Sequence, residues 1–567
     1  MDGTQWILFI LIVQLVHFLG TWKLYVKAGR KSWEAAIPIY NAIVLMKIIN
    51  RPKWWVFLLF IPIINLLMFP VIWVETIRSY GRNSLLESWL VVLTLGFYIY
   101  YVNYSLDVTY IENRGLHPKT ALGEWVSSIV FAVVAATLVH TYFIQPYVIP
   151  TGSLERTLRI GDLLFVSKFH YGARTPMTTV AAPMVHDTLP GLGIKSYLNK
   201  PQLPYFRLPG FTKVKRNDIV VFSWPADTVY QFFKKDKGVI KPIDKKSNYV
   251  KRCVGTPGDS LEVIDGYVYI DGKKLVLPER AKPQYDYTIY GNNGVSSRLF
   301  QDIGIIDFQR KFISPPLNQA QVDALGKYII GFNRRADGQL ELYTKENGIP
   351  VDLIRKLNLP LKEETARARE AALTDEMVAE LEKDPSIDSV KRVITPKGQR
   401  GINLFPQSPD YDWNYDQMGP IYIPEKGKTV ALNLKVLPLY KKIIREYEGN
   451  QLEVSGNQIL INGKVADSYT FKQDYYWMMG DNRDHSEDSR AWGYVPENHI
   501  VGTPIFIWLS FDNFNDGITH WKPRWDRIFT TVHGDGQPRS YFKYFLIALA
   551  AYFVGSYFWG RRKKDKK

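Results

Sequence analysis

Cysteine is nearly absent from this sequence: among its 567 residues there is one, Cys253. A single cysteine excludes a disulfide within the chain. A domain outside the cytoplasm must then be stable through its hydrophobic core, which a chain of this length is large enough to build. Histidine is also scarce, with nine residues, and none belongs to a cluster with metal-ligand spacing. We therefore expect neither a bound metal nor a cofactor.

Long apolar runs are missing from the middle region, 145–540, and are gathered at the two ends of the chain. The runs are Trp6–Leu19, Trp54–Val74, Trp89–Tyr101, Trp125–Ile144 and Tyr541–Trp559. They predict five membrane spans around a soluble middle region. The first run does not have the form of a cleaved signal peptide, because only the acidic Asp2 precedes it and no small-residue cleavage site follows.

Two proline-containing segments near the N-terminus, Ile37–Asn41 and Ile61–Asn65, echo each other. A proline inside a helix removes a backbone hydrogen bond and kinks or ends the helix. We interpret the pair as a helix-hairpin module whose prolines kink the chain or turn it back.

Acidic residues are too few to balance the charge: 71 Lys and Arg face 55 Asp and Glu, a formal net charge of +16. The basic residues are scattered or lie beside apolar runs, without a nucleic-acid-binding motif, so we expect a lipid bilayer as partner and no nucleic acid. By the positive-inside rule, the basic tail 561–567 and the basic connection after the first run are cytoplasmic, which puts 145–540 outside. Arg78 and Arg82 do not fit the positive-inside rule in this arrangement, because five spans place them in a short outer loop.

The middle region carries the pattern of a mainly β structure. Strands rich in β-branched and aromatic residues are predicted at Ile219–Phe222, Tyr249–Val254 and Val501–Trp508. Two similar segments, Leu261–Lys273 and Leu452–Lys464, each predict a hairpin with a Gly-containing turn. The residues between these hairpins look like an insertion, with one helix expected near Leu361–Leu381.

Ser153 is the first candidate for chemistry. It stands in Pro150–Leu158, a few residues after the apolar run that ends at Ile144. An extended chain covers at most about 3.5 Å per residue, so Ser153 lies within roughly 30 Å of the membrane. One interpretation is a Pro/Gly turn in which Thr151 or Ser153 caps a neighbouring element. The other is a nucleophile, which needs a base beside it.

Lys251 is the better candidate for that base. The histidines have no arrangement that favours a triad, and we expect a structural role for His170 in the strand-like segment Phe165–Tyr171. Lys251 lies in an apolar strand, and burial lowers the pKa of a lysine. The alternative is a solvated strand lysine beside Arg252.

A polar segment, Met478–Gly493, completes the set of candidates. Its charge density suggests a calcium loop, but Arg483 occupies the third position, where a carboxylate or amide is required, and the required glycine is missing. The better interpretation is a polar loop whose charged side chains pair with one another as Asp–Arg pairs. Such a loop would hold Ser486 against Lys251.

Taken together and in this order, these stretches resemble the type I signal peptidases (leader peptidases), a family of serine endopeptidases with a Ser–Lys dyad. The resemblance covers roughly residues 125–275 and 450–510. The motifs that carry it are Pro150–Ser153, Arg216–Val220, Lys251–Asp259, and Gly480–Asp484 followed by Asp488–Arg490.

The resemblance implies roles for single residues. Ser153 is the expected nucleophile and Lys251 the general base, while Thr151 joins the Ser153 amide in an oxyanion hole. Ser486 is expected to orient the lysine. The expected structural residues of the loop are Asp481, Arg483, Asp488 and Arg490. The expected substrate pocket is lined by Ile149, Pro150, Leu154, Leu158, Tyr249 and Val250.

Two residues depart from the family's pattern. Leu154 stands where the family usually has methionine, which is a mild apolar exchange. Arg156 stands where the family usually has proline, so access to the pocket or contact with the membrane could differ. Neither departure removes a catalytic group.

The expected fold is a mainly β catalytic domain of the signal-peptidase type with N-terminal and C-terminal transmembrane helices. The predicted parts are a multi-span membrane module 1–124, a transmembrane anchor 125–144, catalytic segments 145–275 and 451–540, an insertion of unknown role 276–450, a C-terminal transmembrane helix 541–560 and a basic cytoplasmic tail 561–567.

The expected function is removal of N-terminal signal peptides from exported preproteins after small residues, at Ala-x-Ala-like sites, at the outer (periplasmic) face of the bacterial plasma membrane. The expected partners are these preproteins, the bilayer and the secretion translocon. Three alternatives are a Ser–Lys protease with another target, an inactive scaffold that keeps the fold, and a transporter. The scaffold is disfavoured because Ser153, Lys251 and Thr151 are all present, and the transporter because the spans are few.

Overall fold

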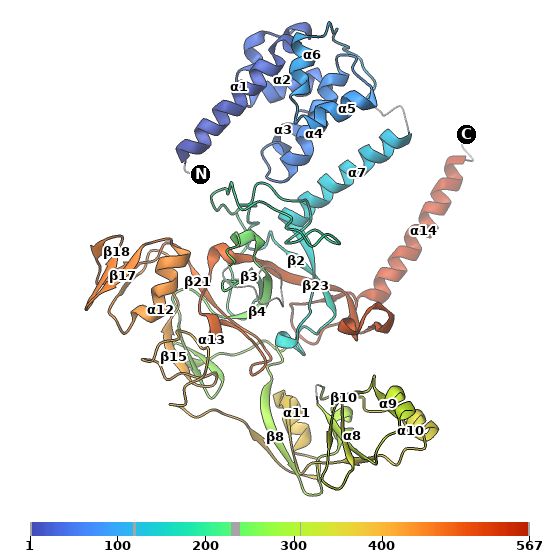
Figure 1. The fold of residues 1–567 in the computed structure, drawn as a ribbon, viewed down its shortest axis with the longest axis vertical. Coiled ribbons are helices and arrows are strands. Elements are labelled where there is room, and N and C mark those ends of the chain that lie inside the picture. The colour runs from blue at the N-terminus through green and yellow to red at the C-terminus, as the bar shows by residue number, and fades with distance from the viewer. Residues whose placement is uncertain (1–2, 117–120, 228–238, 307, 565–567) are drawn as a thin grey trace.

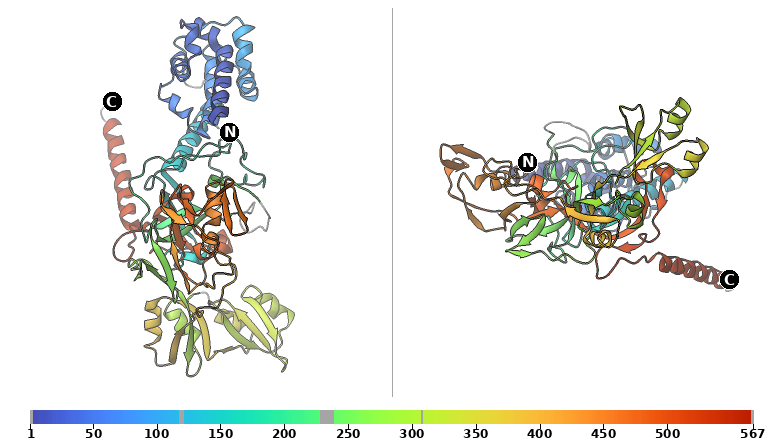
Figure 2. Two further views of the ribbon diagram at one scale, coloured as in Figure 1. Left: turned by 90° about the vertical axis from the view of Figure 1, so that its left-hand side faces the viewer. Right: turned by 90° about the horizontal axis from the view of Figure 1, so that it is seen from below.

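The computed structural model describes residues 3–116, 121–227, 239–306 and 308–564. A helical module at the N-terminus and a small α+β insertion lie at opposite ends of a mainly β region, and a long helix leads away at the C-terminus (Figure 1; Figure 2). The predicted fold class, a mainly β region between apolar helices near the two termini, is confirmed.

Among the described residues, three helices are long and apolar enough to cross a membrane: α1 (Gly3–Lys27), the continuous helix Ala121–Phe143, and Phe542–Trp559. The second combines α7 (Ala121–Leu138) with the π-helical turn η2 (Val139–Phe143), and the third belongs to α14 (Phe542–Lys564). A bent pair, α5 (Leu85–Leu93) and α6 (Tyr98–Tyr104), meets at 117° and brings the number to four if it counts as one span. The predicted count of five spans is therefore corrected.

The predicted span Trp54–Val74 is broken because its chain turns at Pro62. It forms a short helix α3 (Trp55–Leu58) and a second helix α4 (Ile64–Arg78). Ile63 precedes α4 with a φ of +70°, and Ile39 precedes α2 (Tyr40–Ile48) with a φ of +67°. Positive φ is unfavourable for β-branched residues, so the two echoed segments are turns that start helices.

The N-terminal module has its own core and a buried carboxylate. Leu24, Val44 and Val102 are among the residues that pack inside it. The carboxylate of Glu75 lies 2.9 Å from Arg51 Nη2 and also pairs with Arg114. The ion pairs join the end of α4 to the connection after α2 and to the segment that follows α6.

A nine-stranded antiparallel sheet forms the centre of the β region, in the order β1-β2-β23-β3-β4-β21-β22, with β24 and β25 also paired to β23. Its strands are β1 (Ile144–Val148), β2 (Asp162–Ser167), β3 (Ile219–Ser223), β4 (Asn248–Gly255), β21 (Tyr475–Met479), β22 (Val495–Pro496), β23 (Ile500–Asp512), β24 (Lys522–Pro523) and β25 (Thr530–Thr531). Strands β3, β4 and β23 correspond to the three predicted strands.

The two predicted hairpins are present, and each is extended by a third short strand. The first comprises β5 (Ser260–Ile264), β6 (Tyr267–Ile270) and β7 (Lys273–Lys274); the second comprises β17 (Leu452–Ser455), β18 (Gln458–Ile461) and β19 (Lys464–Val465). Asp265-Gly266, Asp271-Gly272 and Asn462-Gly463 have positive φ at both residues, as the tight turns of hairpins require.

The segment predicted as an insertion, 276–450, does not fold as one separate body. Its last part contributes β15 (Met418–Tyr422), which pairs with β5, and the helix α12 (Leu437–Lys442). Strand β16 (Thr429–Ala431) pairs with β20 (Ser468–Thr470). Met418 and Tyr440 lie in one hydrophobic core with Trp477. The structure therefore ends the insertion earlier than the predicted boundary at 450.

The remaining part of that segment forms two small sheets, ordered β10-β11-β9-β12 and β13-β8-β14. Its elements are β8 (Tyr285–Gly291), α8 (Ser297–Asp302), β9 (Arg310–Ser314), α9 (Gln319–Leu325), β10 (Ile329–Arg334), β11 (Leu340–Thr344), α10 (Val351–Lys356), β12 (Lys362–Glu364), β13 (Ala368–Leu373), α11 (Asp375–Leu381) and β14 (Ile387–Arg392).

The single helix predicted near Leu361–Leu381 is wrong over its first half. Residues there form strands β12 and β13, and the helix α11 begins after Thr374, whose side chain accepts a hydrogen bond from the Met377 amide. Strand β13 pairs with β8 along its whole length. Leu373 then joins a core with Tyr285. Tertiary pairing has overridden the helix-favouring composition of this segment.

A fully buried carboxylate, Asp162, ties the central sheet to the segment that leads to α14. Asp162 stands at the start of β2 and accepts hydrogen bonds from Ser510 Oγ at 2.7 Å and from the Arg159 amide at 2.8 Å. Arg527 also pairs with it.

Of the basic tail predicted at 561–567, residues 561–564 continue α14 and residues 565–567 lie outside the described residues.

We expect Asp162→Ala to lower the free energy of unfolding of the β region by about 3–5 kcal/mol, because it leaves buried Arg527 without its counter-charge. The measurement is urea denaturation in detergent followed by tryptophan fluorescence. The matched control is Asp512→Ala, because Asp512 pairs with Arg524 but is exposed, and an exposed pair contributes little. Equal losses in the two variants would contradict this role for Asp162.

Candidate active site

The segment that carries Ser153 is fixed between β1 and β2. The Ile149 amide donates to the Asp162 carbonyl, and the Ile149 carbonyl accepts from the Gly161 amide. Ser153 lies in the single helical turn η3 (Gly152–Leu154), and the Leu154 side chain that follows it is buried in the core. The serine hydroxyl is therefore presented from a turn whose two ends are anchored.

Lys251 reaches this serine from the middle of β4. Strand β4 lies between β3, where Val220 pairs with Lys251, and β21. The Lys251 side chain is buried, with 4% of the residue exposed, and its Nζ donates a hydrogen bond to Ser153 Oγ at 2.5 Å. The structure thus brings together the two residues predicted as nucleophile and base, and it excludes the alternative of a solvated lysine.

The environment of Lys251 lowers the pKa of its amine to about 8 from the ordinary value of 10.5. The main cause is burial, which disfavours the ammonium form. The carboxylates of Asp488 and Glu487 act in the opposite direction and raise the pKa, while Arg490 lowers it. An amine with this pKa has a substantial neutral fraction near neutral pH and can accept a proton.

The polar segment after β21 forms two buried bidentate ion pairs. Asp488 accepts from Arg490 Nε at 2.9 Å and from Arg490 Nη2 at 2.8 Å, as the predicted pairing within the loop requires. Asp481 pairs instead with Arg252 of β4, at 2.8 Å to Nε and 2.6 Å to Nη2. Burial raises the pKa of the Asp481 carboxyl, but Arg252, Thr157 and Arg483 together outweigh burial and hold that pKa below its usual value.

The same loop holds the backbone at Ser153. The Asn482 amide donates to the Ser153 carbonyl at 3.1 Å, and Asn482 Nδ2 donates to the Gly152 carbonyl at 3.1 Å. Sequence analysis did not single out Asn482, although it stands inside a motif that carried the resemblance. A Cβ on Gly480 would lie 2.5 Å from the Ser153 carbonyl oxygen, so glycine is needed for this close approach.

Ser486 lies beside the nucleophile, but its predicted bond to Lys251 is not formed in the structure. A Cβ built on Gly480 would overlap the Ser486 hydroxyl as well as the Ser153 carbonyl, which places both groups around one glycine. The Ser486 hydroxyl is buried and has no hydrogen-bond partner among the described residues. Its role in orienting the lysine stays a prediction.

Thr151 and Pro150 are the exposed residues on the approach to Ser153. The Thr151 backbone is extended, and its hydroxyl makes no hydrogen bond within the part of the chain that the structure describes. The Pro150 carbonyl accepts a bond from Asn515 Nδ2 at 3.3 Å. The Thr151 hydroxyl is thus available to a group outside the protein, as the predicted oxyanion hole requires.

The other residues predicted to line a substrate pocket are buried or half-buried. Ile149, Leu154 and Leu158 are all buried in one core cluster, against which Val250 packs. The Tyr249 ring stacks on Trp224 with 4.9 Å between ring centroids. These side chains are thus already packed against their neighbours, and their role in a substrate pocket stays a prediction.

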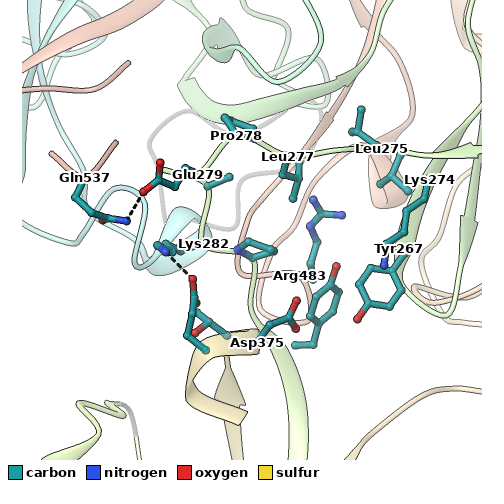
Figure 3. Close-up of a pocket in the computed structure, with 16 residues that line it drawn as sticks. Tyr267, Lys274, Leu275, Leu277, Pro278, Glu279, Lys282, Asp375, Arg483 and Gln537 are labelled. Atoms are coloured by element: carbon teal, nitrogen blue, oxygen red, sulfur yellow. Dashed lines mark hydrogen bonds and ion pairs between the residues drawn. The ribbon is translucent and has the colours of Figure 1, made fainter. Parts of the chain in front are cut away.

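Arg483 does not pair with a carboxylate of the loop. It is buried, makes no ion pair with the residues that the structure describes, and lines a cavity of ≈ 480 Å³ where the insertion meets the β region (Figure 3). Lys282 pairs with Glu376 there at 2.6 Å, and Gln537 donates to Glu279 at 3.2 Å. Neither Ser153 nor Lys251 lines this cavity.

His170 and Cys253 both lie outside the contact between Ser153 and Lys251. His170 bonds to Ser167 through Nδ1 at 2.6 Å, just after β2, as a structural residue would. Cys253 is buried in a core with Val220 and Met478. Within the described ranges, no group of three or more His, Cys, Asp or Glu residues is placed to hold a metal ion.

Two protein families match parts of this chain. The family described as signal peptidase, peptidase S26, matches residues 122–315 and 420–509, which hold Ser153, Lys251 and the polar loop. Residues 33–113, in the N-terminal helical module, match a family of unknown function, DUF5684. The gap in the first match, between 315 and 420, falls within the insertion.

Similar proteins with curated names are signal peptidases I. That of Rickettsia massiliae is 29% identical over 161 residues, 28% of this chain and 47% of the relative. Those of Haemophilus influenzae and Buchnera aphidicola are 21% and 22% identical over 436 and 422 residues, 74% and 72% of this chain and 79% and 85% of the relatives.

The alignment with the Rickettsia massiliae protein spans about half of that protein's length. The family match covers half of this chain, and it covers the part in which the buried lysine meets the serine. This chain belongs to the signal peptidase family, peptidase S26.

Proposed function

We propose that this protein is a membrane-bound serine endopeptidase that removes N-terminal signal peptides from exported preproteins, cutting after small residues at Ala-x-Ala-like sites. The observation that carries the proposal is the 2.5 Å contact between Lys251 Nζ and Ser153 Oγ, with the lysine buried. The relatives are named signal peptidase I, and the family membership agrees with this activity.

The proposed reaction begins with neutral Lys251. Its amine takes the Ser153 proton as the serine oxygen attacks the scissile carbonyl. The oxyanion that forms is stabilised by the Ser153 amide and the Thr151 hydroxyl. The lysine then gives its proton to the leaving amine. Water, deprotonated by the same lysine, attacks the acyl-enzyme ester and releases the signal peptide from Ser153.

The polar loop supports this reaction by positioning its two main groups. Asn482 donates hydrogen bonds to the Ser153 and Gly152 carbonyls, and these bonds fix the position of the proposed nucleophile. Buried Ser486 has an unbonded hydroxyl on the same side, and in this proposal it accepts a hydrogen bond from Lys251 when the lysine turns toward substrate. Such support keeps a catalytic base oriented.

The proposed cleavage preference follows from the packing of side chains next to Ser153. Ile149, Leu154 and Leu158 are packed in one core next to Ser153, so in this proposal the subsites over them are shallow and accept small side chains. A substrate in extended conformation could pair with the backbone near Pro150 and Tyr249. Arg156 is not free to cover this approach, because it donates a hydrogen bond to the Gly304 carbonyl of the insertion.

We propose that the protein lies in the bacterial plasma membrane with its β region on the outer side and its C-terminus in the cytoplasm. With α1 and Ala121–Phe143 as the spans before the β region, residues 28 and 116, at the two ends of the helical module, lie on the cytoplasmic side. Helix α4 packs against the span and begins at its outer end, where Ile63 lines a cavity with His140, so Arg78, at the opposite end of α4, lies toward the cytoplasm. Arg78 and Arg82 then obey the positive-inside rule, and the disagreement met under five spans disappears.

Detergent-solubilised protein should cleave a preprotein with an Ala-x-Ala site, and Ser153→Ala and Lys251→Ala should each lower kcat by about 10⁴-fold or more, because each removes a member of one reacting unit. The measurement is the rate of product formation, with mass spectrometry of the cut site. Lys213→Ala is the matched control, because Lys213 is an exposed lysine outside the site. An inert wild type, or a fully active Lys251→Ala, would overturn the proposal.

The pH dependence of kcat/KM should report the titration of Lys251. Activity requires the neutral amine, so kcat/KM should rise with pH, about tenfold per unit below pH 8, and level off above the pKa of about 8. At pH 7 about a tenth of the enzyme would carry the neutral lysine. A flat profile between pH 6 and pH 9 would contradict Lys251 as the base.

A second variant tests the assignment of that pKa. Glu487 is exposed, and its carboxylate raises the pKa of Lys251. Removing this negative charge in Glu487→Gln destabilises the ammonium form, so the rising limb of the profile should move to lower pH. A limb that moves to higher pH would be inconsistent with a lysine base at this position.

Replacing the Thr151 hydroxyl should slow the chemical step. We expect Thr151→Val to lower kcat by roughly 10²–10³-fold, as the loss of one oxyanion donor does, with little change in KM. Thr151→Ser keeps the donor and should keep most of the activity. Wild-type kcat in Thr151→Val would show that this hydroxyl does not stabilise the transition state.

A further inference from the structure

A second cavity, of ≈ 140 Å³, lies where the helical module meets the β region. Its walls come from the last turn of the span Ala121–Phe143, at His140 and Thr141, and from Ile63 at the start of α4. The β region contributes the loop after β2, including Lys168. Because the span ends at Phe143, the cavity lies at the level where the chain leaves the bilayer.

Positive charge dominates this cavity. Lys168, Arg174 and Lys245 all line it, whereas Asp244 is the one carboxylate among the described lining residues. Asp244 is occupied by other donors: it accepts hydrogen bonds from the Met177 amide at 3.0 Å and from Thr178 through both amide and hydroxyl. It makes no ion pair with the three cations in the described structure.

Two of the cations are held by neutral acceptors. Arg174 donates to the Asn498 carbonyl at 2.9 Å and to Ser223 Oγ at 3.2 Å. Lys245 Nζ donates to the Val185 carbonyl at 3.3 Å. These bonds fix the side chains without an ion pair. The Asp244 carboxylate offsets part of both charges by acting on Arg174 and on Lys245, so net positive charge remains in the cavity.

Lys168 is the cation in this cavity whose amine can bind an anion from outside the protein. Its amine makes no hydrogen bond or ion pair with the described residues, although the cavity shields it from most solvent. Burial and the neighbouring Arg174 lower the pKa of this amine to about 7. An anion in the cavity would reverse this effect by favouring the ammonium form. Helix α4 adds the positive end of its dipole at Ile63.

The loop that continues from this cavity exposes many apolar side chains. They are Met184, Leu192, Ile194, Leu198, Phe206 and Phe211. A solvated loop would not carry so many large apolar groups in one stretch, and the loop follows the strand that pairs with β1, next to the end of the span. The loop and the cavity therefore share one environment, the lipid surface.

We propose that this cavity binds the phosphate group of a phospholipid headgroup, with Lys168 as the main contact and Arg174 and Lys245 supplying further positive charge. Phosphate is the small anion that suits several cations at a membrane surface. The lipid's acyl chains would lie along the span and the apolar loop. Such a lipid fixes the β region against the bilayer, independently of the reaction at Ser153.

The test is binding of phosphatidylglycerol to the full chain in a neutral detergent, followed by native mass spectrometry. Wild type should retain the lipid, and Lys168→Gln should bind it roughly tenfold more weakly. Lys168→Arg keeps the charge and should restore binding, which separates loss of the contact from loss of the fold. Lys213→Gln, an exposed lysine outside the cavity, should bind like wild type.

A competition arm identifies the source of the phosphate. If inorganic phosphate at matched concentration leaves the lipid bound, the headgroup is the ligand, as proposed. If inorganic phosphate displaces the lipid from wild type and not from Lys168→Gln, the phosphate site is supported but its lipid occupant is overturned. Equal lipid retention by wild type and Lys168→Gln, or none by wild type, overturns the site.

Discussion

The chemistry proposed for this site requires the hydrogen bond between the Lys251 amine and the Ser153 hydroxyl, and it requires the burial of that amine. An ammonium group donates to a serine but cannot take its proton. Burial on the central strand β4 removes the water that would stabilise the charged form. The nearby charges are arranged to preserve this state: Arg252 pairs with Asp481 and Arg490 pairs with Asp488, so neither carboxylate is left to pair directly with the lysine.

The second constraint is position relative to the membrane. Strand β1 begins directly where the span Ala121–Phe143 ends, and Ser153 follows β1 within a few residues. The buried pairing of Asp162 with Arg527 connects the same sheet to the segment before α14. The sheet is thus attached to an apolar helix at each of these two places, and Ser153 lies close to the first of them. The proposed substrates, which would themselves be anchored in the bilayer, could reach a serine in this position.

The sequence alone was sufficient to predict those elements whose structure is determined by residues close together in the chain. Strands β3, β4 and β23, the repeated hairpins and the pairing of Asp488 with Arg490 were all predictable, because each depends on residues close in the chain. The partner of Asp481 was not, since Arg252 lies 229 residues away on another strand. Strand β13 was mistaken for helix because only its pairing with β8 decides its conformation. The broken span after Trp54 depends on the backbone of Ile63, which hydropathy does not describe.

The most direct test of this account is to trap the covalent intermediate. Wild-type protein mixed with a preprotein and quenched in acid should carry an ester of the signal-peptide product on Ser153, located by mass spectrometry of the digested protein. Lys251→Ala should carry no ester, because its serine is not deprotonated. An ester on another residue, or cleavage by wild type with Ser153 unmodified under every quench condition, would contradict the central claim that this serine and this lysine form the reacting pair.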